Sequence, residues 1–296
     1  MRSLREVISG VASGQAIGHF NVSNLEMLWG VARAALGHSL TGEAKNLSLP
    51  VIIGVSEGER DAMGLAQIVA LVKSLRASEG IEIFLNADHT SNLDRAKEAI
   101  AAGFDAVLAD GSKMTWEENL KFTQAVVEIA RASGRDIIIE GELGQIGSSS
   151  EVRDTIAEEL ITAPLTTPKQ ALEFVKATGV DLLAPAVGNF HGMLRSGADP
   201  ALNLKLIKQI SVAAGVPLVL HGASGNSDQD IKQAIEAGVR IVHVSTELRA
   251  AYRDALKLSL TDNPDEVAPY KFTRPATQAV ERVVDKKLRL FGNVLS

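Results

Sequence analysis

The chain of 296 residues contains no cysteine. Disulfides, thiolate metal ligands, iron–sulfur clusters and cysteine nucleophiles are therefore all excluded. Any metal ion must be held by histidine, aspartate or glutamate, and the chain has 6 histidines and 36 acidic residues. These residue types are the candidates for metal ligands and for acid–base groups.

Long apolar runs are also lacking. The best run, residues 212–220, is short and contains Gly215 and Pro217, whereas a membrane helix needs about 18 apolar residues or more. The N-terminal segment carries Arg2, Arg5 and Glu6 and no continuous apolar stretch, so it does not match a signal peptide. We expect a cytoplasmic protein with no membrane partner.

A large excess of charge of one sign is absent. The net charge is −6 and the isoelectric point is about 5.6. Neither value gives a general attraction to nucleic acid or to anionic lipid. We expect no nucleic-acid partner, and an anionic substrate would need a local binding site.

The sequence does contain short apolar or β-branched runs that alternate with segments of helical period, as in βαβ units. The eight runs that predict strands are 16–22, 50–56, 81–87, 106–111, 136–141, 182–187, 217–221 and 241–245. Helices are predicted over segments such as 61–78, 115–133 and 168–178. Glycines that would end helices in left-handed conformation stand at 103, 179 and 238. Because no linker separates two halves, we predict an α/β fold with one (β/α)8 TIM barrel over residues 1–296, rather than an open doubly wound sheet.

Two segments exceed the minimal barrel. Residues 142–167 form a connection far longer than a usual βα loop, which is typical of a lid. An insertion with a short helix would give the same pattern. Residues 273–290 have the apolar spacing of an extra C-terminal helix, which would pack on the barrel or on a second subunit.

Polar residues follow the predicted strands at their C-terminal ends, where TIM barrels carry their active sites. Three of the six histidines, His89, His191 and His221, fall at these ends. Neutral imidazoles that converge on one rim can bind zinc and leave a coordination position open. A single histidine there would more often be a hydrogen-bonded rim residue, so the predicted metal site depends on the three together and on the barrel.

Carboxylates accompany the histidines. Asp88 directly precedes His89, and both reach one site only if the strand ends there, because strand neighbours point to opposite faces. Asp88 is the candidate proton donor, and the alternative is that it caps a helix starting near Ser91. Asp110 and Glu142 are either carboxylates of the metal site or rim acids with hydrogen-bond partners.

The loops after the last two strands predict a phosphate site. Residues 222–225 read Gly-Ala-Ser-Gly, and Ser245 and Thr246 follow the eighth strand. Barrels often bind phosphate in this region with backbone amides and a helix N-terminus. The two adjacent loops together make the prediction, since turns use the same residues.

Taken in order, several motifs resemble those of the class II, zinc-dependent fructose-bisphosphate and tagatose-bisphosphate aldolases, and the resemblance spans nearly the whole chain. The motifs are Phe20-Asn21-Val22-Ser23-Asn24, Asp88-His89, Asp110-Gly111-Ser112, Glu142-Leu143-Gly144, His191-Gly192, Val-Leu-His-Gly-Ala-Ser at 219–224 and Thr246-Glu247-Leu248.

The resemblance implies roles for individual residues. It implies zinc ligands at His89, His191 and His221, an alternative metal position at Asp110 and Glu142, and an acid at Asp88 that protonates the aldehyde oxygen. The implied sugar-phosphate pocket consists of Asn21, Ser56, Gly192, Arg195, Gly222, Ser224, His243, Ser245 and Thr246. Glu151, in the long loop, is the candidate for the proton-abstracting base.

Some positions depart from the family pattern. Glu151 stands one place late, and Arg195 stands where the family often has lysine. His243 stands where the last strand usually offers asparagine to the substrate. Tyr270 stands where an arginine usually reaches the second phosphate, so that Lys271 or Arg274 would have to replace it.

The resemblance implies zinc-dependent retro-aldol cleavage of fructose 1,6-bisphosphate, or of a close ketose phosphate, to dihydroxyacetone phosphate and an aldehyde by a homodimer or homotetramer. No lysine stands on the sixth predicted strand, where one would have suggested an imine-forming aldolase. The alternatives are an aldolase-like lyase for another sugar phosphate and an inactive relative that binds zinc and sugar phosphate. A monovalent-cation requirement stays open.

Overall fold

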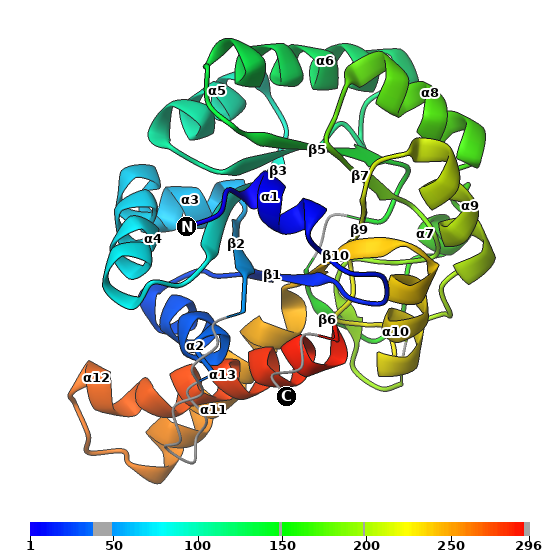
Figure 1. The fold of residues 1–296 in the computed structure, drawn as a ribbon. Coiled ribbons are helices and arrows are strands. Elements are labelled where there is room, and N and C mark those ends of the chain that lie inside the picture. Colours follow the sequence, from blue (N-terminus) through cyan, green and yellow to red (C-terminus); the bar gives the residue numbers. More distant parts are fainter. Residues whose placement is uncertain (38–48, 148–149, 198, 293–296) are drawn as a thin grey trace.

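The computed structural model describes residues 1–37, 49–147, 150–197 and 199–292. Eight strands close into a barrel in the order β1-β10-β9-β7-β5-β4-β3-β2, with helices around it (Figure 1). The strands are β1 (Ile17–Asn21), β2 (Val51–Val55), β3 (Ile83–Thr90), β4 (Ala106–Ala109), β5 (Ile138–Leu143), β7 (Leu182–Pro185), β9 (Leu218–Leu220) and β10 (Val239–Val244). The predicted TIM barrel is confirmed, and each predicted strand overlaps an observed one.

The surrounding helices follow the strands in alternation. They are α2 (Leu25–Ala35), α3 (Glu57–Met63), α4 (Leu65–Glu79), α5 (Leu93–Ala102), α6 (Trp116–Ala132), α8 (Pro168–Thr178), α9 (Leu204–Ala214), α10 (Asp228–Ala237) and α11 (Thr246–Asp262). The single helix predicted over 61–78 is wrong, because Gly64 takes a φ of 82° and separates α3 from α4. Within the described residues, no helix has both the length and the apolar composition needed to span a membrane.

Side chains that point into the barrel change character along the strands. At the N-terminal ends they form one apolar cluster with α1 (Leu4–Ser9), which lies across that end of the barrel in Figure 1. Residues two positions further along a strand face the same side. In β1, β3, β5 and β10 those residues are polar, namely His19, Asn86, Glu140 and His243. The C-terminal half of the interior is therefore built for chemistry, and the N-terminal half for stability.

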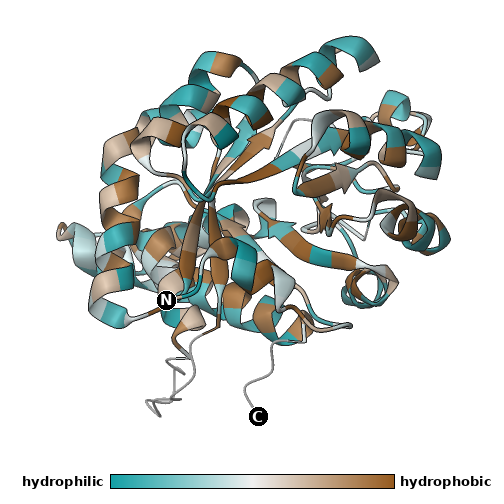
Figure 2. Cartoon of the chain, turned by 45° about the horizontal axis from the view of Figure 1, so that its top comes forward, coloured by the Kyte–Doolittle hydropathy of each residue, from teal (hydrophilic) through white to brown (hydrophobic). Residues whose placement is uncertain are grey.

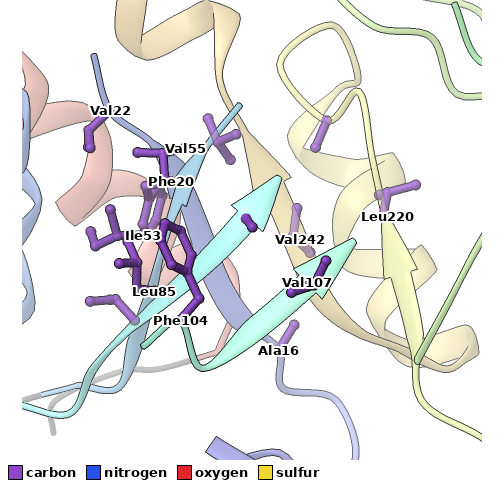
Figure 3. Close-up of a cluster of buried hydrophobic side chains, with 14 of the residues drawn as sticks. Ala16, Phe20, Val22, Ile53, Val55, Leu85, Phe104, Val107, Leu220 and Val242 are labelled. Carbon is purple, nitrogen blue, oxygen red and sulfur yellow. The ribbon is translucent and has the colours of Figure 1, made fainter. Parts of the chain in front are cut away.

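The alternate side chains of the strands point outward and pack against the helices. Figure 3 shows Phe20, Ile53 and Leu85 gathered with Phe104 in this buried cluster. The strands are mostly hydrophobic in Figure 2, whereas the helices carry both hydrophobic and hydrophilic segments, as expected for helices with one face on a core.

The long connection between β5 and α8 has structure of its own. It contains β6 (Val152–Arg153) and α7 (Glu158–Ile161), and β6 pairs in parallel with β8 (Met193–Leu194). Ser148 and Ser149, which belong to this predicted lid segment, lie outside the described residues. The connection is thereby joined to the loop that follows β7 and carries His191.

The C-terminal segment adds α12 (Pro269–Phe272) and α13 (Arg274–Leu290). The helix expected over 273–290 is thus present, and it packs against α2 and α11 of the same chain. A Cβ added to Gly30 of α2 would lie 2.8 Å from Val280 Cγ1 and 2.9 Å from the carbonyl oxygen of Thr277. The close approach of α2 and α13 therefore requires glycine at this position.

Candidate active site

A β-bulge in β3 carries both Asp88 and His89 to the same side. The pairing of β3 with β4 shifts register between Ala87 and Thr90, and His89 has a φ of 44°. Positive φ is uncommon outside glycine, and such strained positions cluster at functional sites. The Thr90 hydroxyl donates to the Ala87 carbonyl and accepts from Arg60 Nη1, each over 3.1 Å. Asp88 and His89 can therefore both reach the same site, because a bulge interrupts the regular alternation of the strand at this point.

The loops after β7 and β9 bring two more histidines together. Gly222 has a φ of 70°, and a Cβ there would lie 2.2 Å from the carbonyl oxygen of Phe190, so the two backbones touch. Asn189 Nδ2 also donates to the carbonyl oxygen of His221 over 3.0 Å. The rings of His191 and His221 consequently lie with centroids 5.6 Å apart.

His89, Glu142, His191 and His221 each present one atom that could bind a metal ion, and these atoms lie within 4.8 Å of one another. Both Glu142 oxygens, His191 Nε2 and His221 Nδ1 are buried and have no hydrogen-bond partner among the described residues. Leaving buried polar atoms unpaired costs about 1 to 3 kcal/mol each. A divalent cation would satisfy these atoms together, and imidazole with carboxylate is a common ligand set for one.

Carboxylates contact a ring nitrogen in two of these histidines. His89 Nδ1 lies 2.8 Å from Asp110 Oδ2, and His221 Nε2 lies 2.7 Å from Glu140 Oε1. Such contacts orient ligand histidines and set which nitrogen is free. Asp110, expected at a metal position, is here the hydrogen-bond partner of His89. Glu140 was not predicted, although its two-residue spacing from Glu142 on one strand signals a shared face.

The electrostatics of the group favour a cation. Burial would lower the pKa of His89, but Asp88, Asp110 and Glu142 outweigh burial and raise it to about 10. Burial, with Asp110 nearby, raises the pKa of Glu142 to about 7. Burial also holds the pKa of His191 well below its usual value. In the absence of metal, the surrounding carboxylates therefore favour the protonated, positively charged form of His89. A divalent cation bound here would supply positive charge in place of that proton.

Asp88 directs one oxygen toward the pocket. Asn21 Nδ2 donates to Asp88 Oδ2 over 2.8 Å, whereas Oδ1 is buried without a hydrogen-bond partner in the described part of the chain. Asp88 Oδ1 lies 4.0 Å from His89 Nε2 and 3.6 Å from His243 Nδ1. The capping alternative for Asp88 does not hold, because Asn92 occupies the N-cap of α5.

The N-terminus of α11 opens onto the same pocket. Ser224 Oγ accepts from the backbone N–H groups of Ser245 (3.3 Å) and Glu247 (3.2 Å), and Ser245 Oγ is buried without a partner among the described residues. Helix N-termini favour anions through unpaired N–H groups and the helix dipole. The pocket, of about 340 Å³, is lined by twelve of the predicted residues: Asn21, Ser56, Asp88, His89, Asp110, His191, Gly192, Gly222, Ser224, His243, Ser245 and Thr246.

Four predicted residues lie outside this pocket lining, namely Glu142, Glu151, Arg195 and His221. Glu142 and His221 are buried. For Arg195 and Glu151 this position differs from their expected roles. The exposed Arg195 pairs with Asp154 over 2.7 Å, and the Glu151 side chain is exposed. Backbone hydrogen bonds flank the two-stranded sheet and fix both residues, since Met193 N donates to Glu151 O and Arg195 N to Arg153 O.

Lys271 and Arg274, which would have to replace the arginine that the family usually has at the position of Tyr270, also lie outside the pocket lining. Lys271 Nζ pairs with Glu266 over 2.9 Å, and Tyr270 is 76% exposed. Neither these residues nor Arg274 belong to the lining of the pocket.

Two cations that were not predicted do line the pocket, Lys113 and Arg249. Arg249 Nη2 lies 2.6 Å from Glu59 Oε1, and its Nε is buried without a partner in the described residues. Arg249 follows Thr246 by three residues, so both lie on one face of α11. That helical spacing is the signal in the sequence that could have found it.

The chain is similar to known aldolases over nearly its whole length. The profile described as "Fructose-bisphosphate aldolase class-II" matches residues 3–294. The chain is 36% identical to the fructose-bisphosphate aldolase of Staphylococcus epidermidis over 294 residues, which cover 98% of this chain and 96% of that protein. The crystal structure of the YdjI aldolase from Escherichia coli K12 matches with a TM-score of 0.77 and 30% identity, over 98% of this chain and 97% of that one. The chain belongs to the class II fructose-bisphosphate aldolase family.

Proposed function

We propose that this family member, a carbon–carbon lyase acting on sugar phosphates, reversibly cleaves fructose 1,6-bisphosphate to dihydroxyacetone phosphate and glyceraldehyde 3-phosphate. One observation carries the proposal. His89 and His191 line one pocket together with Asp88 and the N-terminus of α11, and the ligand atoms of Glu142 and His221 lie within 4.8 Å of those of the two histidines. A retro-aldol reaction needs a site for the phosphate, charge stabilisation at the carbonyl and a proton acceptor, and the pocket offers each.

We infer that the metal of this aldolase is zinc, held by His89, His191 and His221, with Glu142 as the adjoining carboxylate. Three protein ligands with an open position are typical of catalytic zinc. Bound zinc supplies a Lewis acid that stabilises the negative charge of the enediolate left by bond cleavage. The unpartnered nitrogens of His191 and His221 support this assignment.

The protein's own groups place the substrate and move the proton. The phosphate of the three-carbon half binds at the N-terminus of α11, with Ser224, Ser245 and the amide of Thr246. Asp88 Oδ1 takes the proton of the C4 hydroxyl as the C3–C4 bond breaks, and it returns that proton to the aldehyde oxygen in condensation. Asn21 holds the other oxygen of Asp88.

Proton exchange at C3 needs a second group, and Glu151 stays the candidate. Its carboxylate is exposed in this structure. Its neighbour Ser150 belongs to the pocket lining, which supports Glu151 as the group nearest to this task in the long connection.

Arg249 and Lys113 are the candidates for the second phosphate. Glu59 orients the Arg249 guanidinium and leaves its Nε unpaired at the pocket. Charge-assisted hydrogen bonds contribute about 1.5 to 3 kcal/mol each. Arg249→Met should therefore lower kcat/KM for fructose 1,6-bisphosphate by about 10 to 150-fold, and leave that for fructose 1-phosphate nearly unchanged. Lys271→Met is the matched control and should change the kcat/KM of neither substrate.

Formation of products tests the function itself. Fructose 1,6-bisphosphate incubated with the zinc-loaded protein should yield equal amounts of dihydroxyacetone phosphate and glyceraldehyde 3-phosphate. Binding without turnover would favour the inactive relative. Turnover of a different ketose phosphate alone would favour the lyase for another sugar phosphate.

We further propose a cytoplasmic homodimer or homotetramer. Exposed apolar side chains on and near α11 and α12 support a contact surface, since Leu258 is 60% exposed, Val267 86% and Tyr270 76%. Light scattering in solution would measure the oligomer. Activity in sodium against potassium buffers would measure the monovalent-cation requirement.

A further inference from the structure

His19 and His243 lie side by side beneath the pocket. β1 and β10 are parallel neighbours, and His19 and His243 are partners in their register, so their side chains point to the same side. The ring centroids are 3.4 Å apart and the ring planes are 2° from parallel. Both residues are buried, at 0% and 5% exposure. We call these two residues the histidine pair.

Neighbouring strands fix the histidine pair on several sides. A Cβ on Gly54 of β2 would lie 2.1 Å from Cε1 of His19, so only glycine leaves room for this ring. Asn86 Nδ2 lies 3.1 Å from His19 Nε2 and donates to it. On the other side of the pair, His221 stacks on His243 with centroids 4.0 Å apart. The ring of His243 is therefore held between two other rings.

His243 faces the pocket and His19 does not. His243 is part of the pocket lining, and its Nδ1 lies 3.6 Å from Asp88 Oδ1. Its Nε2 is buried without a hydrogen-bond partner among the described residues. His19 is absent from the lining, so it can influence a bound substrate only through its neighbours.

A second metal site is the competing explanation for this arrangement, because His19, Asp88 and His243 also present atoms within 4.8 Å of one another. A metal ion binds imidazole in the plane of the ring. The two ring planes are nearly parallel and about one ring thickness apart, so no single ion lies in both. The histidine pair is therefore better suited to positioning than to ligation.

We propose that His243 contacts the C4 oxygen of the ketose phosphate and discriminates between its two configurations, and that His19 is a positioning residue that fixes the ring of His243. This inference rests on the proposed function. An oxygen that exchanges a proton with Asp88 Oδ1 lies next to His243 Nδ1. A ring clamped on both faces cannot rotate to follow a displaced oxygen, whereas an unclamped side chain can.

The test compares fructose 1,6-bisphosphate with its C4 epimer, tagatose 1,6-bisphosphate. The quantity measured is the ratio of the two kcat/KM values. His243→Asn should change this ratio by about tenfold, the scale of discrimination by one substrate contact. His19→Ala should change it in the same direction, because the ring of His243 loses its support. His19→Phe keeps a stacked ring and should restore a ratio close to that of the wild type.

The double variant His19→Ala/His243→Asn separates positioning from a general structural role. Because His19 acts through His243, the double variant should match His243→Asn alone in the epimer ratio, which is a non-additive result. Ile241→Val is the control, since it trims a buried residue of β10 at the other end of the barrel interior. It should leave the ratio unchanged. Ring-nitrogen NMR should show shifted His243 signals in His19→Ala, independently of turnover.

The outcomes are distinguishable. A wild type that cleaves neither epimer contradicts the proposed function, and the inference falls with it. An active wild type whose ratio is unchanged by His243→Asn, or in which the two substitutions act additively, overturns the inference alone. If His19→Ala does not fold, His19→Phe and His243→Asn decide. A shifted ratio in His19→Phe as large as that in His243→Asn would also overturn it.

Discussion

At the scale of single residues, the site is defined by buried polar atoms that have no hydrogen-bond partner among the described residues. His221 has one nitrogen on Glu140 and the other unpaired, and both oxygens of Glu142 are unpaired. In a buried environment such atoms are costly without a partner. A bound metal ion would supply the missing interactions of these atoms.

Removing a metal ligand should remove the metal. His191→Ala and His221→Ala each take away one imidazole, and we expect zinc content to fall from about one ion per chain to near zero, with loss of turnover. Arg195→Ala is the control, since this side chain is exposed and outside the pocket. Elemental analysis after dialysis gives the occupancy. Full zinc in His221→Ala would show that the site is misassigned.

Asp88 should affect chemistry and leave the metal in place. Asp88→Asn keeps the size of the side chain and an oxygen for Asn21, but it removes the group that accepts a proton. We expect kcat to fall by about 100-fold or more, with zinc content near that of the wild type. Steady-state kinetics with parallel metal analysis measures both. Loss of zinc, or an unchanged kcat, would contradict proton transfer by Asp88.

The sequence could locate these residues but not all of their contacts. His89, His191 and His221 were predictable because strand ends meet on one rim of a barrel. The bulge that turns His89 was not, because it depends on tertiary contacts of Thr90 and Arg60. Arg195 lies outside the pocket because β6 of the long connection pairs with β8, directly before Arg195. No local sequence pattern signals this pairing.

At the scale of elements, β1, β3, β5 and β10 combine an apolar N-terminal end with polar residues further along, and the helices are defined by their caps. The strands were predictable because short apolar runs alternate with segments of helical period. Gly103 and Gly179 end helices as predicted, with φ values of 112° and 71°. Gly64 was not recognised as a break, because an isolated glycine is tolerated within a helix. With a φ of 82°, it is both the C-cap of α3 and the N-cap of α4.

Packing between α2 and α13 should depend on Gly30. Gly30→Ala places a methyl group 2.8 Å from Val280 Cγ1, and overpacking of this kind costs about 1 to 3 kcal/mol. The matched control is Gly58→Ala in α3, where a Cβ meets nothing within 4 Å. That change should stabilise by up to about 1 kcal/mol through helix propensity. Urea unfolding measures the free energy of unfolding of both variants. Equal changes in the two variants would contradict the packing of α2 against α13 described here.

At the scale of the whole molecule, stability and chemistry occupy opposite ends of the barrel. The N-terminal segment closes one end, with α1 on the apolar cluster and Arg2 paired to Glu82 over 2.6 Å. The site occupies the other end. One barrel over nearly the whole chain was predictable from the eight units, whereas the internal strands of the long connection were not, because two-residue strands carry no periodicity.

The Arg2–Glu82 pair predicts a pH-dependent contribution to stability. The hydrogen bond from Arg2 lowers the pKa of Glu82, so the contribution is present above the unfolded pKa of about 4.5 and is lost as the pH falls through the lower folded value. Arg2→Ala should lower the free energy of unfolding at pH 7 by at most about 1 kcal/mol, since the pair is partly exposed. The difference from wild type should shrink as the pH falls below about 4.5 and vanish once Glu82 is protonated in the folded state. A difference that grows on acidification would contradict the assignment.

The central claim is a metal-dependent aldolase whose metal is held by three histidines, and chelation tests it most directly. The retro-aldol rate with fructose 1,6-bisphosphate is measured before and after dialysis against a chelator, and again after zinc is added back. The account predicts activity that is abolished by the chelator and restored by about one equivalent of zinc per chain. A cleavage rate that is unchanged in metal-free protein would contradict it.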